Sequence, residues 1–350
     1  MRYPDFINPG ETIGFPAPSF GCNIEPYIST FAAAKQKFTE LGYATEDGPN
    51  SHAGDGVGIS STPQNCAKEF CDMYSSDTTQ ALISCGGGEL MCEILPYLDL
   101  DVIKMSKPKW FMGYSDNTNL TFLLTTIFDT AAIYGPCVAS FGQEKWHACV
   151  QDAFSVLTGD KRLVSEDENG VKVISVHNYD GWESESLKDE EHPFVSYNIT
   201  EEFNPIVMGD DHAKGRLLGG CLDCLSKLVG TRFDKVRDFN EKYSSDGILW
   251  YLEACDLNVF DMRRSLWNLR EAGWFDKASG FMFGRPMHFD EPMFGLDRIA
   301  ALTEPLKGLG VPVFLDLDIG HLPPMMPIIN GAYGEIEVKN GAVSLNMSLK

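Results

Sequence analysis

Short apolar runs alternate with longer amphipathic runs over residues 12–138, and this alternation restricts the fold more than any other feature. Apolar runs at 12–19, 79–85, 108–115 and 131–138 predict strands, while the runs at 24–42, 65–77 and 117–129 have the spacing of helices. Repeated strand–helix units are typical of a parallel sheet with helices on both faces. We therefore predict an α/β fold with a parallel-sheet domain over residues 1–160.

The pattern changes between residues 159 and 211, which are polar and acidic with short alternating pieces suited to hairpins. We interpret 161–212 as a linker and insert, and long irregular inserts are often functional. A second α/β domain is predicted over 213–350. Its expected helices are 215–231, 257–273 and 298–310, its expected strands are 247–255, 279–285 and 311–321, and a hairpin with an Asn-Gly turn is expected at 334–347.

Charge and cysteine usage restrict the partners and the compartment. A formal charge of −22, spread along the sequence, would repel a phosphate backbone, so we expect no nucleic-acid partner. No apolar run has the length of a signal-peptide core or a membrane span, so we expect no membrane partner. Ten cysteines without a signal segment predict reduced thiols and a cytoplasmic location. Cys221 and Cys224 form a C-x-x-C, which we interpret as buried thiols rather than a metal or redox site.

Ser115 lies on the corner of "WFMGYSDNTNL", where a predicted strand runs directly into a predicted helix. Such a tight turn can project a nucleophilic hydroxyl from the edge of a sheet beside helix amides. The second glycine of G-x-S-x-G is missing, because Asn117 occupies its place. The alternative is that Ser115 or Asp116 caps the helix, a common role for both residue types.

Three consecutive glycines, Gly86, Gly87 and Gly88, follow the strand at 79–85. Glycine lets the backbone approach a ligand closely. The turn is therefore a candidate oxyanion hole or phosphate cradle, although neither nucleotide-binding glycine motif is present and a plain tight turn is the alternative. In a parallel sheet this turn and the Ser115 turn lie at the same carboxyl edge, where such sheets bind ligands.

Glu253 and His321 are the candidate partners of Ser115. Glu253 ends an apolar strand, where burial of a carboxylate requires an imidazole or a cation; Arg263 or Arg264 is the alternative partner. His321 follows a strong strand and precedes two prolines, which would fix its ring, although a structural histidine is the alternative. Serine, carboxylate and imidazole together form a nucleophile, a base and an orienting group.

With these residues assembled, the chain resembles the LD-carboxypeptidase family of serine peptidases, which includes the microcin C self-immunity peptidases. The likeness is carried by "GETIGFPAPS", "CGGGEL", "GYSDNT", "GRLLGGCLDCLSKLVGT", "LEACD" and "DIGH". It implies a flavodoxin-like N-terminal domain, a C-terminal α/β domain, a homodimer, and no metal or cofactor. It also implies Ser115 as nucleophile, His321 as general base and acid, Glu253 as its orienting partner, and the amides of Gly87 and Asp116 as the oxyanion hole.

The resemblance implies two substrate classes. The Asn117-containing corner and the acidic insert favour the microcin immunity branch, which cleaves an amide between an acidic amino acid and a nucleotide-like group. Gly86, Gly88, Asn117 and Trp182 are then the candidate substrate-binding residues, although Trp182 could equally serve to pack the insert. Gly88 departs from the Tyr or Asn common at that place in the family. The other branch releases a terminal D-amino acid from muropeptides and needs a cation for a carboxylate, for which the candidates are Lys214, Arg216, Arg232 and Arg285. A ligand-binding protein without catalysis is the alternative of another class.

Overall fold

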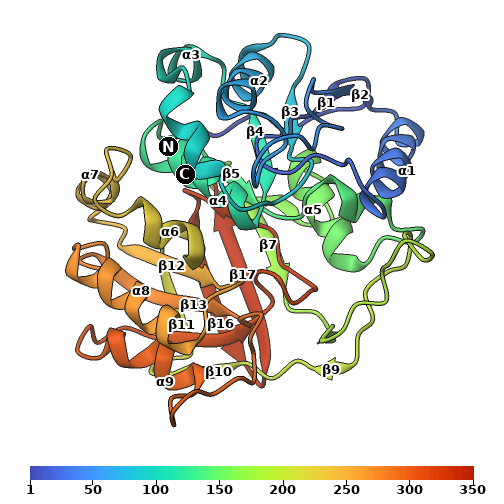
Figure 1. Ribbon diagram of the computed structural model, residues 1–350. Coiled ribbons are helices and arrows are strands. Elements are labelled where there is room, and N and C mark those ends of the chain that lie inside the picture. The colour runs from blue at the N-terminus through green and yellow to red at the C-terminus, as the bar shows by residue number, and fades with distance from the viewer.

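The first of the two large sheets lies in the N-terminal part of the chain, as the computed structural model of residues 1–350 shows (Figure 1). Its strands run in the order β15-β5-β4-β3-β1-β2, and β1 to β5 are all parallel. The order 2-1-3-4-5 is that of flavodoxin-like folds, so this prediction is confirmed. The elements are β1 (Thr12–Phe15), α1 (Tyr27–Glu40), β2 (Ala44–Asp47), α2 (Pro63–Ser75), β3 (Ala81–Ile83), η1 (Met91–Tyr97), α3 (Leu100–Met105), β4 (Trp110–Gly113), η2 (Ser115–Asn117), α4 (Thr118–Thr126), β5 (Ala132–Tyr134), η3 (Val138–Gly142) and α5 (Ala148–Thr158), where η marks a 3₁₀ helix.

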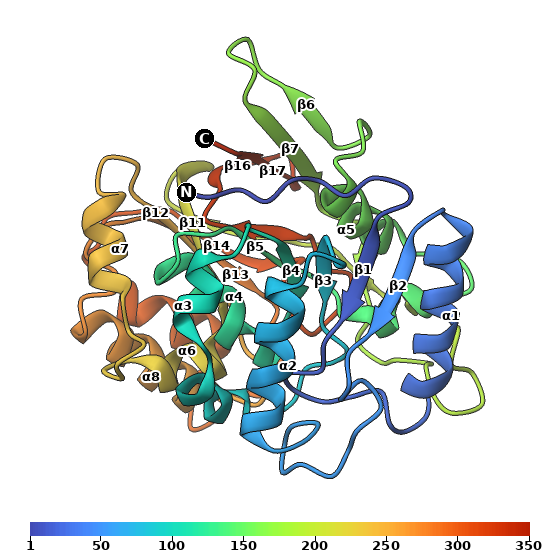
Figure 2. The same cartoon turned by 90° about the horizontal axis from the view of Figure 1, so that it is seen from above.

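Helices cover both faces of the first sheet. Buried apolar residues of α1 and α5 belong to one core cluster, and those of α2 and α4 belong to another. Figure 2 shows α1 to one side of the strands and α2 with α3 to the other. Both faces of β3 and β4 are therefore dry, which explains why these strands are continuous apolar runs.

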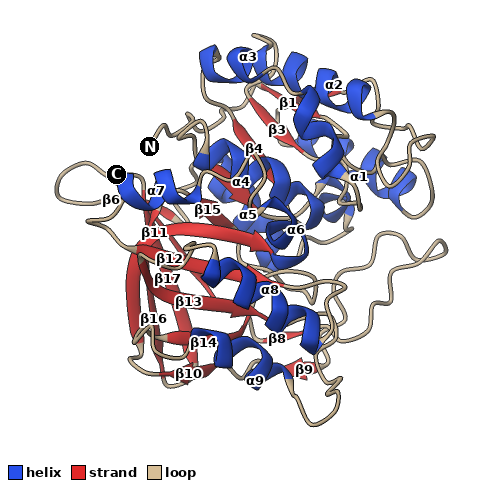
Figure 3. Ribbon diagram, turned by 60° about the vertical axis from the view of Figure 1, so that its left-hand side comes forward, coloured by secondary structure: helices blue, strands red, loops and turns tan.

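The second sheet has nine strands in the order β10-β14-β13-β12-β11-β16-β17-β7-β6. Strands β11 to β14 are parallel, and the remaining pairs are antiparallel. Helices α8 and α9 lie on one face (Figure 3). The elements after α5 are β6 (Val164–Glu166), β7 (Lys172–His177), β8 (Gly181–Trp182), β9 (Glu201–Glu202), β10 (Ile206–Met208), β11 (His212–Cys221), α6 (Leu222–Leu228), α7 (Val236–Lys242), β12 (Ile248–Glu253), α8 (Val259–Glu271), β13 (Ala278–Gly284), α9 (Arg298–Thr303), η4 (Glu304–Leu306), β14 (Val313–Leu317), β15 (Ile328–Asn330), β16 (Tyr333–Lys339) and β17 (Ala342–Ser348).

The helix predicted over 215–231 is wrong in its first half, because β11 extends through Cys221 before α6 begins. Leu217 and Leu218 point into different core clusters, which is the alternation of a strand. A Cβ at Gly219 would overlap the carbonyl oxygen of Tyr251 in β12. Gly219, which the sequence pattern assigned to a helix, is therefore needed for close packing between strands.

The division of the chain into 1–160, 161–212 and 213–350 stays a prediction. Strands from one predicted part join the sheet of another part in two places. Strands β6, β7 and β10 come from the predicted insert and extend the second sheet, and β15 comes from the C-terminal part and pairs with β5 of the first. The predicted hairpin is confirmed: β16 and β17 are joined by Asn340 and Gly341, both with positive φ.

Arg216 ties both ends of the chain to the second sheet and is only 5% exposed. Its guanidinium donates hydrogen bonds to Asp246, to the carbonyls of Gly331 (3.0 Å) and Lys350 (2.9 Å), and to the Tyr3 hydroxyl (3.0 Å). The two termini accordingly lie near each other in Figures 1 and 2. Arg216 was a candidate cation for a substrate carboxylate, but its side chain is already committed to these structural partners.

We predict that Arg216→Leu lowers the free energy of unfolding by about 3 kcal/mol, because it leaves these acceptors and the Asp246 charge without their partner. Urea denaturation followed by circular dichroism measures the change. Lys214→Leu is the control, since Lys214 lies exposed on the same strand. Equal stabilities of the two variants would contradict the prediction.

Candidate active site

Ser115 lies at a strained corner between β4 and α4. Its φ is 62°, a left-handed conformation that costs a non-glycine residue about 1–2 kcal/mol. Gly113 ends β4, and a Cβ there would lie 2.7 Å from the Asn117 side chain. Neither η2 nor α4 receives a side-chain cap from Ser115 or Asp116. The helix-cap alternative therefore does not account for this serine.

His321 contacts both other members of the predicted triad. Its Nε2 lies 2.9 Å from Ser115 Oγ, and its Nδ1 lies 2.7 Å from Glu253 Oε2. Gly320 precedes it with a φ of 98°, and a Cβ there would lie 2.6 Å from Glu253 Oε2. Only glycine lets the backbone pass this close to the carboxylate. The three side chains predicted from separate strand ends are thus brought together.

Glu253 ends β12 and is 2% exposed. Its second oxygen, Oε1, accepts a hydrogen bond from the Tyr134 hydroxyl at 2.5 Å. The alternative of Arg263 or Arg264 as partner does not hold, because the ion-pair partner of Glu253 is His321 and Arg264 pairs with Asp261 on α8. Both carboxylate oxygens therefore have partners, as burial of this charge requires.

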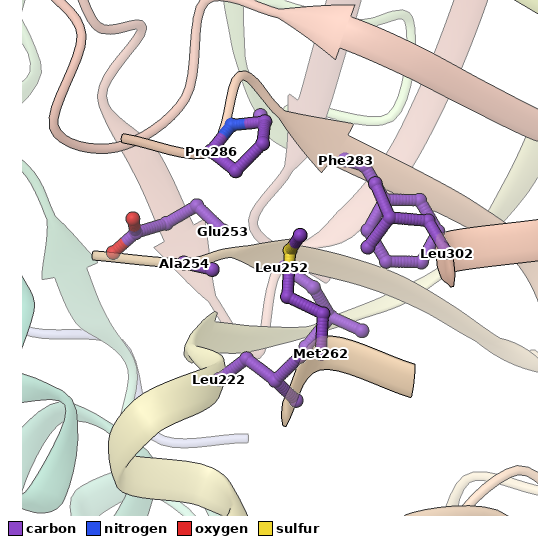
Figure 4. Close-up of a pocket in the computed structure, with 9 residues that line it drawn as sticks. Leu222, Leu252, Glu253, Ala254, Met262, Phe283, Pro286 and Leu302 are labelled. Carbon is purple, nitrogen blue, oxygen red and sulfur yellow. The ribbon is translucent and has the colours of Figure 1, made fainter. Parts of the chain in front are cut away.

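The stem of Glu253 borders a small apolar cavity that lies behind the site. Figure 4 shows the carboxylate directed away from Leu252, Met262, Phe283 and Leu302, which line the opposite side. No polar group of that lining competes for the carboxylate, so its orientation is set by the partners in front of it.

Glu253 and His321 shift each other's pKa in opposite directions. Burial alone would lower the pKa of His321, but the Glu253 carboxylate raises it well above its usual value. Burial alone would raise the pKa of Glu253, but the His321 charge and hydrogen bond hold it below its usual value. Each shift favours the charged form of its group, whereas general-base action at His321 Nε2 requires the neutral imidazole.

The glycine turn lies against the serine. A Cβ on Gly87 would be 3.1 Å from Ser115 Cβ and 3.2 Å from its Oγ. Among the hydrogen bonds made outside helices and strands, none has the Gly87 N–H as donor. A Cβ on Gly88 would overlap the Ser19 hydroxyl, which explains why a larger residue cannot occupy this place here. The turn is held close enough to Ser115 to present a free amide to it.

Two buried side chains hold this arrangement in place. Asp116 Oδ2 accepts hydrogen bonds from the Ser19 hydroxyl (2.6 Å) and the Met91 N–H (2.9 Å). Asn117 is fully buried, and its Nδ2 donates to the Gly86 carbonyl at 2.8 Å. Asn117 was predicted to contact the substrate, but its side chain instead fastens the glycine turn to the corner.

The four candidate cations do not gather at the triad. Arg285, like Arg216, is buried, and it pairs with Asp318 at 2.6 Å while donating to the Leu322 carbonyl. Lys214 and Arg232 are exposed. Lys214 lies seven residues before Cys221 on β11, roughly 23 Å from the carboxyl edge at the usual rise of a strand.

Trp182 lies in β8 and is 8% exposed. Its indole N–H donates to the Glu202 carbonyl at 3.1 Å, and its ring packs against Phe289 and the Arg285 guanidinium. Most of the Trp182 ring therefore packs the insert, as the alternative interpretation of this residue expected. The remaining part lines a cavity of about 540 Å³.

The wall of this cavity contacts the turn that follows β14, because Arg285 donates to the Leu322 carbonyl at 3.3 Å. The Glu183 N–H donates to the Pro323 carbonyl at 2.7 Å, two residues beyond His321. This hydrogen bond joins the segment that carries Trp182 to the turn that carries His321. We name this hollow the Trp182 cavity; its lining combines aromatic rings, arginines and carboxylates, namely Trp182, Phe289, Arg285, Arg298, Glu201, Glu202 and Asp316.

The cysteines are all free thiols. Cys221 is buried and Cys224 partly so, and the Cys224 Sγ lies 3.7 Å from the Ser115 carbonyl oxygen.

Sequence reasoning missed Tyr134, although "AAIYGPCV" places it at the end of a predicted strand on the same sheet edge. No helix of the protein has the length and apolarity that a bilayer crossing requires.

Two α/β domains bring a serine, an imidazole and a carboxylate into a continuous line of contacts. This arrangement is typical of a serine-type hydrolase. A sequence profile described as the LD-carboxypeptidase N-terminal domain matches residues 13–135, and one described as the C-terminal domain matches residues 214–336. Together they cover more than half of the chain. The protein belongs to the LD-carboxypeptidase family and is a serine-type peptidase.

Individual relatives come from both branches of the family. The chain is 25% identical over 289 residues to the microcin C7 self-immunity protein MccF of Escherichia coli, covering 82% of this chain and 79% of that protein. It is 23% identical over 339 residues to a probable murein peptide carboxypeptidase of Bacillus subtilis, covering 94% and 89%. The structure of MccF in complex with glutamyl sulfamoyl guanosine superposes with a TM-score of 0.80 at 22% identity, over 99% of this chain and 98% of that one.

We predict that the second-order rate of Ser115 labelling by a fluorophosphonate rises with pH and levels off above the raised pKa of His321, because the proposed base must be neutral. Glu253→Gln removes the charge that raises the His321 pKa, so the acid limb moves to lower pH while the maximal rate falls roughly 10²- to 10⁴-fold. Labelling measured from about pH 5 to pH 9 gives both quantities.

The control is Glu271→Gln, a change at an exposed glutamate at the end of α8. It should leave the profile unchanged. An acid limb that stays in place in Glu253→Gln would contradict the assignment of His321 as the titrating base.

Proposed function

We propose that this protein hydrolyses an amide bond through an acyl-enzyme, with Ser115 as nucleophile, His321 as general base and acid, and Glu253 as the orienting carboxylate. The observation that carries the proposal is the continuous contact from Ser115 Oγ through His321 to Glu253, at 2.9 Å and 2.7 Å. The contact is compatible with catalysis only if His321 Nε2 is deprotonated, since an imidazolium would donate rather than accept.

In the first half of the reaction, Ser115 Oγ attacks the amide carbonyl carbon and its proton passes to His321 Nε2. The developing oxyanion accepts hydrogen bonds from the amides of Gly87 and Asp116. The carbon–nitrogen bond then breaks, and His321 returns the proton to the leaving nitrogen. The proximity of Gly87 to Ser115 Oγ supports this placement of the oxyanion hole.

In the second half, a water attacks the ester carbonyl and gives its proton to His321. The ester bond breaks, Ser115 recovers its proton, and the free carboxylic acid leaves. Glu253 stays ionised throughout and stabilises the imidazolium that forms twice in the cycle.

The substrate class we propose is an amide between an acidic amino acid and a nucleotide-like group. Solved complexes of MccF contain glutamyl sulfamoyl guanosine and aspartyl sulfamoyl adenosine. In this chain the Trp182 cavity offers the aromatic edges of Trp182 and Phe289, while its two arginines, Arg285 and Arg298, already pair with Asp318 and Asp316. We propose that the nucleotide-like part of the substrate lies toward this cavity.

The second candidate is release of a terminal D-amino acid from muropeptide tetrapeptides. The similarity to a probable murein peptide carboxypeptidase supports it. It requires a cation for the terminal carboxylate, and the two buried candidates, Arg216 and Arg285, already hold carboxylates of the chain itself. A ligand-binding protein without catalysis is the third candidate, and the intact triad contacts disfavour it.

The homodimer and the cytoplasmic location stay predictions. Light scattering, which measures the molar mass in solution, tests the homodimer.

A substrate panel decides between these candidates. Aminoacyl sulfamoyl nucleosides with Glu, Asp and a neutral amino acid are compared with a muropeptide tetrapeptide, and products are followed by mass spectrometry. We expect cleavage of the acidic aminoacyl compounds. Cleavage of the tetrapeptide alone would replace the first candidate by the second, and no cleavage together with saturable binding would favour the third.

We predict that Ser115→Ala lowers kcat on the best substrate by about 10⁵-fold, because the attacking oxygen is removed while binding contacts stay. Ser75→Ala at the exposed end of α2 is the matched control and should have wild-type activity. Circular dichroism verifies that both variants fold. Near wild-type turnover in folded Ser115→Ala would exclude this serine as the nucleophile.

A further inference from the structure

We propose that Tyr134 is a positioning residue that connects the nucleophile corner to the orienting carboxylate. Its hydroxyl accepts a hydrogen bond from the Ser115 N–H at 3.2 Å and donates one to Glu253 Oε1 at 2.5 Å. The inference rests on the proposed roles of Ser115 and Glu253 and adds a fourth side chain to them.

The strand register explains how one hydroxyl reaches both groups. Tyr134 ends β5 and pairs with Gly113 of β4, two residues before Ser115. Glu253 ends β12 in the second sheet, 119 residues further along the chain. Tyr134 therefore links a backbone group of the first domain to a side chain of the second.

Hydrogen-bond direction at Tyr134 is fixed by its single proton. Burial and the Glu253 charge raise the pKa of Tyr134 well above its usual value, so the phenol keeps its proton and gives it to the carboxylate. Its oxygen then accepts from the Ser115 N–H. With the two contacts of His321, the hydrogen bonds form a closed ring that leaves Ser115 at its amide and returns to it at its hydroxyl.

This closed ring of hydrogen bonds has two consequences for catalysis. The Ser115 N–H is occupied by Tyr134, so it is not free to bind the oxyanion, which leaves that role to neighbouring amides. The second bond to Glu253 prevents the carboxylate from rotating and disperses part of its charge away from His321. Tyr134 thereby restrains both the strained corner and the basicity of the imidazole.

The ring of Tyr134 is rigid enough for this role. It is completely buried, and it packs against Tyr114 with centroids 6.4 Å apart and against Tyr251 with centroids 5.5 Å apart. Tyr251 provides a natural comparison because its hydroxyl is also buried and makes no hydrogen bond. The Tyr134 hydroxyl is therefore hydrogen-bonded to Ser115 and Glu253, whereas the neighbouring Tyr251 hydroxyl is not.

The test compares Tyr134→Phe with Tyr251→Phe by the rate of Ser115 labelling with a fluorophosphonate as a function of pH. Tyr134→Phe should slow labelling at its pH maximum by about 10- to 100-fold, which corresponds to loss of one hydrogen bond to a charged group. Its acid limb should move to higher pH, because the carboxylate then acts more strongly on His321. Tyr251→Phe should match the wild type in both respects.

The readouts separate this role from structural support and from the proposed function. Loss of packing or of fold would lower the melting temperature without moving the acid limb. If the wild type is labelled and Tyr134→Phe matches Tyr251→Phe in rate and acid limb, Tyr134 has no positioning role. If the wild type itself does not react at Ser115, the proposed function fails instead.

A second variant covers the case in which Tyr134→Phe does not fold. Incorporation of 3-fluorotyrosine at position 134 alone keeps the hydroxyl and makes it a stronger acid. The stronger donor withdraws charge from Glu253, so the acid limb should move to lower pH, opposite to the shift expected for phenylalanine. An unchanged limb in that protein would overturn the proposal.

Discussion

The burial of the Glu253 carboxylate is the constraint on which the active-site arrangement depends. A carboxylate that is 2% exposed at the end of an apolar strand is stable only when both oxygens have partners. Those partners, His321 and Tyr134, come from the turn after β14 and from the first sheet. Correct docking of the two domains is thus required by electrostatics as well as by apolar packing, and the same docking assembles the triad contact.

The corner that carries Ser115 stores strain that its surroundings balance. Its left-handed backbone is held by the Tyr134 hydroxyl at the amide, by Asn117 beneath the glycine turn, and by Asp116, which binds Ser19 and the Met91 amide. These groups are buried and hydrogen-bonded to one another. Conformational entropy is therefore lost on folding rather than on substrate binding, which is how a preorganised site lowers a barrier.

In the function we propose, specificity depends on a different part of the molecule. The segment between β7 and β11 contributes β8, β9 and β10 and forms much of the Trp182 cavity, whereas the triad lies on the parallel strands of the two sheets. Under this proposal, rigid strand ends carry the chemistry and a less regular segment borders the substrate, an arrangement that allows one family to act on different amides. This separation fits the similarity of the chain to both a microcin immunity protein and a murein peptide carboxypeptidase.

The sequence alone determined the α/β alternation, the corner at Ser115, the glycine turn beside it, and the placement of Glu253 and His321 at strand ends, because these are local signals of periodicity and turn chemistry. Only the tertiary structure decided that 215–221 is a strand, since that depends on the close approach of β12. It likewise decided that His321 rather than an arginine pairs with Glu253, and that Tyr134 completes the ring of hydrogen bonds. The two contacts of Glu253 join residues 68 and 119 positions apart, and no local pattern encodes which distant partner reaches a buried charge.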